Sequence, residues 1–363
     1  MSLYDLEIAD WQTLLTDQPA FRAKQIWKAI HQSGVRPGQL TSLPQQLRDT
    51  LEGNPALSSA LELVHLSRSK DHMTDKALFR LFDGQVVETV LMHYHDRSTV
   101  CVSSQAGCAM NCGFCATGQR GFFRHLKVGE IIEQVIWAAN RTKLSRGDRR
   151  LSNIVFMGMG EPLANTKNLF PALRRINSEI GIGARHMTIS TVGIIPGINK
   201  FAQLDLQVNL AISLHAANNE KRSKLIPVNN RYPVEDLIDA LRQYRKLTNR
   251  RVSFEWAMID GVNDTDKDAS ELIRLSIPIG AHVNLIPLNP TPGWPTKGSP
   301  MQRVKEFAAL VERAGVPVSI RDNRGTEIDA ACGQLAGTID LMSQGEQIYL
   351  RNSGKIELGA LLN

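Results

Sequence analysis

Short apolar runs alternate with amphipathic stretches along most of the chain. From residue 99 onward, segments with helical periodicity, such as VGEIIEQVIWAANR and VEDLIDALRQYRKL, separate runs of β-forming residues. This alternation predicts βα units around a parallel sheet. We expect an α/β fold with a TIM-like β/α barrel, full or partial, whose functional groups gather at the carboxyl ends of the strands. An open doubly wound sheet is the alternative. The expected strands are TVCVS, NIVFMGM, HMTIST, QVNLAIS, VSFEWAM, HVNLIPL and VPVSI.

The first part of the chain has a different pattern. Residues 1–75 are predicted to be helical. The segment FRAKQIWKAIHQSG places apolar side chains on one face of a helix, and LPQQLRDTLEG forms a second, shorter helix. The apolar face of the longer helix consists of Phe21, Ile26, Trp27 and Ile30.

Strand-like runs, ALFRLF and VVETVLM, follow from residue 77, and Asp83-Gly84 marks a hairpin turn between them. This hairpin leads into the main domain. The predicted organisation is a small N-terminal helical accessory domain over 1–75, a β-hairpin bridge over 76–100, the barrel over 101–345 and a C-terminal tail over 346–363.

Composition and charge narrow the class of protein only slightly. The chain has 363 residues, 42% of them hydrophobic, which is enough for one large core and a smaller domain. The net charge of +6 favours an RNA partner slightly, and solvated loop charges are the alternative explanation. The basic residues gather in two stretches: Arg120, Arg124 and Lys127, and a loop-like stretch with Arg141, Lys143, Arg146, Arg149 and Arg150.

Targeting signals and cysteine number indicate a reducing compartment. The sequence shows no basic region followed by an apolar run at its start, and no stretch of about eighteen uncharged apolar residues. We therefore expect a cytoplasmic protein without a membrane as a partner. Five cysteines are an odd number without a secretory signal, so metal or redox chemistry is a better expectation than a disulfide framework.

Three cysteines form a compact cluster in CAMNCGFC. Cys108, Cys112 and Cys115 are separated by three and then two residues. Three thiolates can bind three irons of a [4Fe-4S] cluster and leave the fourth iron open to the amino and carboxylate groups of S-adenosylmethionine (SAM). A structural zinc site with Cys101 as fourth ligand and a fully ligated electron-transfer cluster are the alternatives. The six-residue gap between Cys101 and Cys108 fits neither well.

The C-x-x-x-C-x-x-C spacing, with Phe114 before its last cysteine, resembles the radical SAM signature. Further segments, in matching order from about Phe21 to Leu335, resemble the RlmN and Cfr family of radical SAM RNA adenosine methyltransferases, and are closest to the RlmN branch. These segments are CVSSQAGC, FCATGQRGF, FMGMGEPLAN, LAISLHA, IDGVND, VNLIPLNP and IDAACGQLAG. Two others, TVGIIP and RSKLIPVNNRYP, are nearer to Cfr.

The resemblance implies a SAM site at the strand ends. In GMGEP, glycines permit close backbone approach and a carboxylate could hold an ammonium group, although a Gly-x-Gly turn alone is weak evidence. Taken singly, the other positions would more often be capping or turn residues. The implied SAM contacts are Gly160, Glu161, Ser190, Ser213, Leu214, His215 and Asn289.

Two cysteines lie outside the cluster motif, where the ordinary role is that of a small buried side chain. Cys332 stands among small residues in DAACGQL, and Cys101 ends a strand before the cluster loop, so both thiols could reach one cavity and form a transient disulfide. The resemblance implies that one SAM methylates Cys332 to S-methylcysteine, that a second SAM supplies a radical, and that Cys101 releases the product. It makes Glu88, in VVETV, the proton acceptor, with an exposed strand glutamate as the alternative.

The resemblance also implies the substrate. Carbons 2 and 8 of adenine are poor nucleophiles, so their methylation needs a radical route. The RlmN branch modifies carbon 2 of an unstacked adenosine in 23S rRNA and of the adenosine 3′ to the anticodon in tRNAs. Basic loops and the N-terminal domain would dock RNA phosphates.

Further expectations concern the reductant, the oligomeric state and the alternative functions. A flavodoxin-type reductant is implied by the family, and we expect a monomer. Cfr-like methylation of carbon 8 and, from a different class, a noncatalytic RNA-binding protein with a structural metal site are the alternatives. His93 and His95 are expected at the surface and receive no role.

Overall fold

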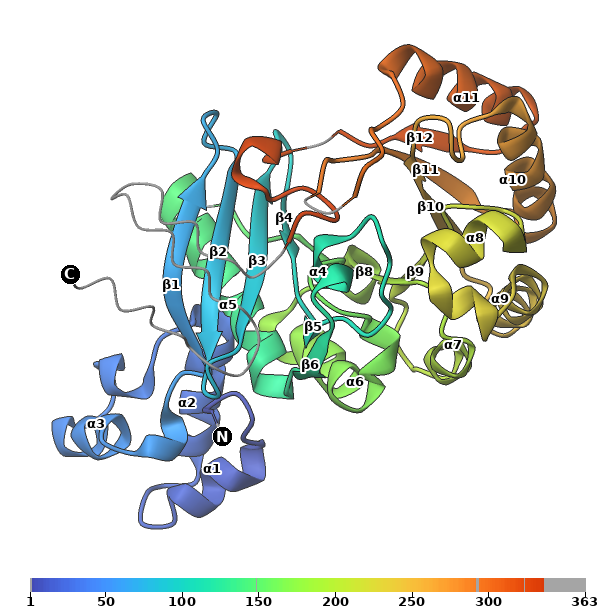
Figure 1. Ribbon diagram of the computed structural model, residues 1–363. Helices are drawn as coiled ribbons and strands as arrows, with labels where there is room; N and C mark the ends of the chain where they lie inside the picture. The colour runs from blue at the N-terminus through green and yellow to red at the C-terminus, as the bar shows by residue number, and fades with distance from the viewer. Residues whose placement is uncertain (1, 148, 292–293, 323, 336–363) are drawn as a thin grey trace.

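A ten-stranded sheet forms the centre of the computed structural model, which describes residues 2–147, 149–291, 294–322 and 324–335 (Figure 1). The strand order is β1-β2-β3-β4-β7-β8-β9-β10-β11-β12. In this order, neighbouring strands from β4 to β12 pair in parallel, and neighbouring strands from β1 to β4 pair antiparallel. In the described part of the chain β1 and β12 are free edges, so the sheet stays open. The expected α/β fold with a partial barrel is confirmed.

The parallel strands form where the sequence alternates apolar runs and helices. Figure 1 shows helices arrayed along one side of these strands. The strands are β4 (Ser98–Cys101), β7 (Asn153–Phe156), β8 (Met187–Thr191), β9 (Asn209–Ser213), β10 (Val252–Met258), β11 (His282–Pro287) and β12 (Val318–Ile320). The helices are α5 (Val128–Arg146), α6 (Thr166–Arg175), α7 (Ile195–Ala202), α8 (Asn219–Leu225), α9 (Val234–Thr248), α10 (Asp266–Ile279) and α11 (Met301–Arg313).

Side chains along a strand point alternately to its two faces, and this alternation builds the interior of the partial barrel. In β8, Met187 and Ile189 are fully buried in the core, whereas Thr188 and Ser190 line a cavity on the other face. The concave face of the sheet is therefore more polar than the face that packs against the helices.

The predicted hairpin joins β2 (Thr74–Leu81) to β3 (Val86–His93). Its turn contains Gly84 with φ +81°, a conformation that glycine adopts without strain, and the Leu81 N–H donates to the carbonyl of Gln85 at 2.7 Å. The strand β3 then pairs with β4, which begins the parallel part of the sheet. A short ribbon, β5 (Gln105–Gly107) with β6 (Phe122–His125), flanks the cysteine loop, in which α4 spans Ala116–Gln119.

The N-terminal helices are α1 (Ile8–Leu14), α2 (Phe21–Lys28) and α3 (Gln45–Glu52), and β1 spans Leu61–Arg68 within the stretch expected to be helical. Ile26, Trp27 and Ile30 are buried as expected, but Phe21 is 58% exposed. At about 100° per residue, Phe21 lies about 140° around the helix from Ile26, so the two cannot share a face. The expectation for Phe21 was wrong.

A bridging segment, residues 324–335, crosses from the end of β12 to the antiparallel strands. The Arg324 guanidinium donates to the His93 carbonyl at 3.3 Å, and the Lys76 ammonium donates to the Asp329 carbonyl at 3.3 Å. The segment lies beside β2 and β3 and carries Cys332 (Figure 1). The predicted tail over 346–363 lies outside the described residues, as does 336–345 of the predicted barrel.

No helix in the described ranges is long and apolar enough to cross a membrane.

Candidate active site

A cavity of about 470 Å³ lies at the carboxyl ends of the parallel strands, a volume typical of small-molecule sites. Residues from the ends of β4, β7, β8, β9, β10, β11 and β12 line it, together with the cysteine loop and the bridging segment. The sequence-predicted residues among them are Cys101, Cys108, Cys112, Cys115, Gly160, Glu161, Ser190, Ser213, His215, Asn289 and Cys332. Leu214 and Glu88 do not line it.

The cysteine loop is compact because its backbone is tied at both ends. The Cys108 N–H donates to the Gly121 carbonyl at 2.7 Å, and the Cys115 N–H donates to the Cys112 carbonyl at 3.1 Å. Burial, with smaller contributions from Glu161 and the neighbouring motif thiols, raises the pKa of Cys108 to about 12 and that of Cys112 well above its usual value. A positively charged metal centre is what would hold these thiols as thiolates.

The loop geometry discriminates between the metal groups expected from the sequence. Within the described residues, no three His, Cys, Asp or Glu side chains converge closely enough to hold one metal ion. Zinc needs its thiolates at about 2.3 Å from a common centre, so it fits this arrangement poorly. In a [4Fe-4S] cluster each thiolate binds a separate iron, so three separated thiols that line one cavity fit a cluster with an open iron.

In the loop after β7, the backbone at Gly160 packs closely against Gln105. Gly160 has φ +101°, and a Cβ atom there would lie 2.5 Å from the Cβ of Gln105. The carboxylate of Glu161 accepts the Leu163 N–H at 3.0 Å and the Val192 N–H at 2.9 Å. Burial nevertheless raises the pKa of Glu161 to about 7. The Glu161 carboxylate therefore holds the loops after β7 and β8 together, and the glycines place no side chain in the cavity wall.

Polar groups from β8 and β9 meet in the cavity. The hydroxyl groups of Ser190 and Ser213 lie 3.2 Å apart. The Nδ1 atom of His215 accepts the Ala257 N–H at 2.8 Å, and burial lowers the pKa of His215 to about 3, so the imidazole is neutral and presents Nε2–H. The side chain of Leu214 is fully buried away from the cavity, which leaves only its backbone for a ligand contact.

Arg222, on α8, was not found from the sequence. Its side chain is fully buried, and the guanidinium donates to the carbonyls of Leu214 at 3.2 Å, Val192 at 2.5 Å and Ser213 at 3.4 Å. It also donates to the Asn229 side chain at 2.8 Å. Burial lowers the pKa of Arg222 to about 10, and the Cys112 thiol opposes this shift. The guanidinium thus connects the ends of β8 and β9 next to the cysteine loop.

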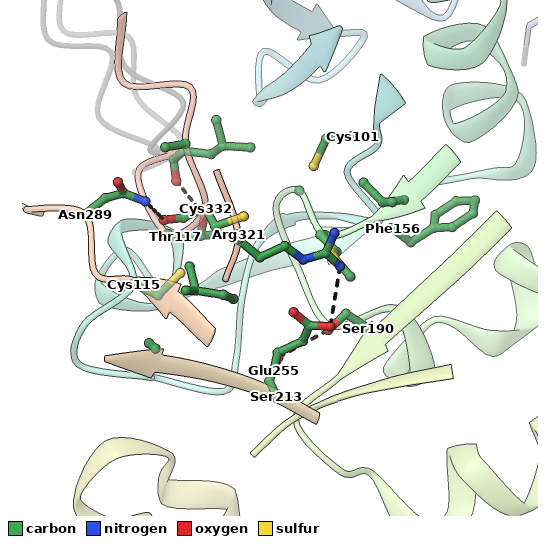
Figure 2. A pocket seen from close by; sticks show the side chains of 18 of the residues that line it. Cys101, Cys115, Thr117, Phe156, Ser190, Ser213, Glu255, Asn289, Arg321 and Cys332 are labelled. Atoms are coloured by element: carbon green, nitrogen blue, oxygen red, sulfur yellow. Dashed lines mark hydrogen bonds and ion pairs between the residues drawn. The ribbon is translucent and has the colours of Figure 1, made fainter. Parts of the chain in front are cut away.

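The two cysteines outside the motif share the cavity. Figure 2 shows Cys101 and Cys332 reaching it from β4 and from the bridging segment. The Cys332 side chain is accessible within the cavity although protein surrounds it, and burial raises its pKa. Burial and, to a smaller extent, the thiol of Cys332 raise the pKa of Cys101 above its usual range. The structure places both thiols on one cavity, and both are free.

Two charged side chains in the cavity were missed by the sequence analysis. Glu255, on β10, accepts an amide N–H of Asn284 at 2.7 Å, and Arg321 follows β12 with its guanidinium 3.8 Å from the Glu255 carboxylate (Figure 2). Glu255 raises the pKa of Cys332 and Arg321 lowers it. For Glu255, the sequence did contain a signal, because it is the single charged residue within the otherwise mostly apolar run VSFEWAM.

Glu88 lies outside the cavity lining, on β3. It is buried, which contradicts the alternative of an exposed strand glutamate, and its carboxylate is 3.0 Å from the Lys76 ammonium. Lys76 also contacts the Asp329 carbonyl, so it links Glu88 to the bridging segment. His93 is likewise buried, contrary to expectation, with Nδ1 2.9 Å from the Ser98 hydroxyl, whereas His95 is exposed.

The basic stretch is only partly a loop. Arg141 and Arg146 belong to α5, which extends further than the charge pattern suggested. Arg141 pairs with Asp75 at 2.8 Å, and Arg149 donates to the His95 carbonyl at 2.8 Å. The side chains of Arg141 and Arg149 therefore support the fold, which reduces the number available to RNA.

Comparisons with known proteins agree with this site. Residues 102–273 match the model of the Radical SAM superfamily. The chain is 47% identical to the probable dual-specificity RNA methyltransferase RlmN of Chloroflexus aurantiacus, over 96% of this chain and 97% of that protein, and 48% identical to the one from Corynebacterium glutamicum, over 88% of each. The chain belongs to the RlmN family of RNA methyltransferases. A crystal structure of a radical SAM methyltransferase from Sphaerobacter thermophilus is 45% identical, with a TM-score of 0.88 over 93% of this chain and 99% of that chain.

Membership of the RlmN family decides between the classes left open by the sequence. The chain is a radical SAM enzyme, and such enzymes use a [4Fe-4S] cluster and SAM. The noncatalytic RNA-binding alternative is therefore wrong.

Proposed function

We propose that this RlmN-family enzyme methylates carbon 2 of adenosine in 23S rRNA and of the adenosine 3′ to the anticodon in tRNAs. One observation carries the proposal: the thiols of Cys101 and Cys332, far apart in sequence, line one cavity with all three motif cysteines. A cluster and SAM alone would not need them. Two further thiols in that cavity support a covalent route for the methyl group.

Cys332 is the proposed methyl carrier. Its thiolate attacks the methyl carbon of a first SAM and displaces S-adenosylhomocysteine, which leaves Cys332 as S-methylcysteine. Because burial and Glu255 raise the pKa of Cys332, the thiolate needs a nearby positive charge, and Arg321 supplies one. When bound, the cluster and a second SAM supply the radical that removes a hydrogen atom from the S-methyl group.

Cys101 is the proposed release group. After the methylene carbon has bonded to the adenine, Cys332 is bonded to RNA through that carbon. The Cys101 thiolate attacks the Cys332 sulfur and a disulfide forms. The electron pair of the broken sulfur–carbon bond stays on the methylene carbon, which takes up a proton to become the methyl group of the base. Two electrons from an external reductant restore both thiols. The presence of both thiols on the lining of one cavity supports this step.

Glu88 is the proposed acceptor of the adenine ring proton. It does not line the cavity, but Lys76 connects it to the bridging segment, three residues before Cys332. RNA binding must therefore bring the base toward β3 for Glu88 to act. The variant Glu88→Gln keeps the shape of the side chain and removes its basicity, so adduct formation without product is the expected result.

The test is an anaerobic reaction of the reconstituted enzyme with SAM, a reductant and RNA, followed by mass spectrometry of the nucleosides. We expect 2-methyladenosine and the consumption of two SAM molecules per product. A product methylated at carbon 8 would move the enzyme to the Cfr-like alternative. Formation of 5′-deoxyadenosine without any methylated adenosine would refute the substrate.

The proposed intermediate can be trapped with single variants. Cys101→Ala should accumulate a covalent enzyme–RNA adduct, visible as a shifted band in a denaturing gel, because nothing attacks the Cys332 sulfur. Cys332→Ala should give neither adduct nor product. Normal turnover by Cys101→Ala would refute the release step.

The flavodoxin-type reductant, the monomeric state and the cytoplasmic location stay predictions.

A further inference from the structure

Two arginines lie over one tyrosine ring at the opening of the cavity. The guanidinium carbon of Arg97 is 4.3 Å from the centroid of the Tyr94 ring, and that of Arg324 is 4.5 Å from it. All three residues line the cavity, and the Arg97 side chain is 47% exposed. A lining residue that is half exposed must lie where the cavity meets solvent. We call Tyr94, Arg97 and Arg324 the rim.

The rim is assembled from distant parts of the chain. Tyr94 and Arg97 belong to the turn between β3 and β4, which the Tyr94 N–H closes by donating to the Arg97 carbonyl at 2.8 Å. Arg149 holds the same turn through the His95 carbonyl, and Arg324 binds the His93 carbonyl from the bridging segment. These contacts hold the two arginines in place before a ligand arrives, which reduces the entropy lost on binding.

The two arginines of the rim form ion pairs that a ligand can replace. Arg97 pairs with Asp96 at 3.3 Å and Arg324 pairs with Asp322 at 3.3 Å, and the two carboxylates are 69% and 76% exposed. Exposed ion pairs of this kind are weak. A phosphate group, which matches the planar donors of arginine, can replace such a carboxylate.

We propose that the rim binds the phosphates that flank the adenosine entering the cavity. This inference rests on the proposed function. An RNA loop suits this site because an adenosine must be unstacked to reach the thiols inside the cavity, and its phosphates then remain near the rim. A guanidinium held over an aromatic ring also offers a surface on which a neighbouring base can stack.

The proposed contacts explain how one enzyme can accept two RNAs. Phosphate contacts set position and orientation but do not read sequence. A rim that binds the backbone on both sides of the target would accept an rRNA loop and a tRNA anticodon loop equally, and discrimination would be left to other surfaces.

The test is fluorescence anisotropy with a labelled RNA stem-loop that carries an adenosine in its loop, over a series of salt concentrations. We expect Arg97→Ala and Arg324→Ala each to weaken binding about tenfold and to lower the slope of log affinity against log salt by about 0.7, the value for one lost phosphate contact on a single strand. Tyr94→Ala should also weaken binding about tenfold, and Tyr94→Phe, which keeps the ring, should stay within about twofold of the wild type.

Arg242→Ala is the matched control. Arg242 lies on α9, is 53% exposed and pairs with the exposed Asp239, as the rim arginines pair with their carboxylates, but it does not line the cavity. We expect its affinity and salt slope to equal those of the wild type. An equal loss in Arg242→Ala, or wild-type binding by Arg97→Ala and Arg324→Ala, would overturn the rim while leaving the proposed function intact. Failure of the wild type to bind the stem-loop would overturn both.

Discussion

Replacing Arg222 tests whether one buried cation holds the ends of β8 and β9 together at the cavity. The variant Arg222→Met keeps an unbranched apolar side chain of similar length and removes the guanidinium. The carbonyls of Val192, Ser213 and Leu214 then lose a fully buried donor. These carbonyls belong to the strand ends that form the cavity wall, so the effect should reach both stability and SAM binding.

The magnitude follows from the hydrogen bonds that are lost. The guanidinium makes four, and a bond from a charged donor contributes about 1.5–3 kcal/mol. Burial of the cation opposes this gain, since it takes several kcal/mol to remove a charge from water. Removing one partner from such a buried arrangement typically costs about 3–5 kcal/mol, so we expect a loss of about 3 kcal/mol in the free energy of unfolding. Arg222→Lys keeps the charge with fewer donors and should lose about half as much.

The assay is urea unfolding of the metal-free proteins, followed by far-UV circular dichroism, with SAM affinity measured separately on the reconstituted enzymes. Arg242→Met is the control, because an exposed arginine should change stability by no more than about 0.5 kcal/mol. A loss below about 1 kcal/mol in Arg222→Met, with unchanged SAM affinity, would show that water or neighbouring donors replace the guanidinium and would refute the reasoning.

Three further outcomes follow from single residues. Arg175 donates to Nε2 of His31 at 2.8 Å, and burial lowers the pKa of His31 to about 4. The free energy of unfolding should therefore fall as the pH is lowered from about 6.5 toward 4. Unfolding curves of His31→Asn, measured in parallel with the wild type, should lack this part of the acid dependence. Gly160→Ala would force a Cβ against Gln105 at a positive φ, so SAM affinity measured by calorimetry should fall at least about tenfold. Cys115→Ser should lower bound iron, measured by plasma emission, to near background, and unchanged iron would contradict the assignment of the ligands.

The parallel sheet and the cysteine loop could be predicted because their signals are local. Every expected parallel strand is present, since a short β-rich run between helical segments is specified by its own residues. The cluster spacing is similarly contained in eight residues, CAMNCGFC. The strand β1 was missed because it is an edge strand: Leu63 is 47% exposed, and its pattern does not show a continuous buried face.

The polar groups of the site could not be predicted in the same way. Arg222 is specified by three carbonyls on other elements, and Arg321 by a carboxylate on β10, so no local pattern identifies either. The burial of His93 depends on the bridging segment and on α5, which both contact it from distant parts of the chain. Such positions are decided by tertiary contacts, which an alternating pattern does not contain.

The bridging segment places the proposed methyl carrier on a part of the chain that is separate from the cluster loop. The cluster loop and the polar strand ends are anchored in the sheet, whereas Cys332 is carried by a strap whose anchors include the Asn289 amide and the main chain of Ala116. A related chain could keep the whole radical-generating half and exchange only the strap, and it would then direct the same radical at another acceptor. The open edge of the barrel thus separates the generation of the radical from its use, which gives the fold a route to new reactions without a change in its core.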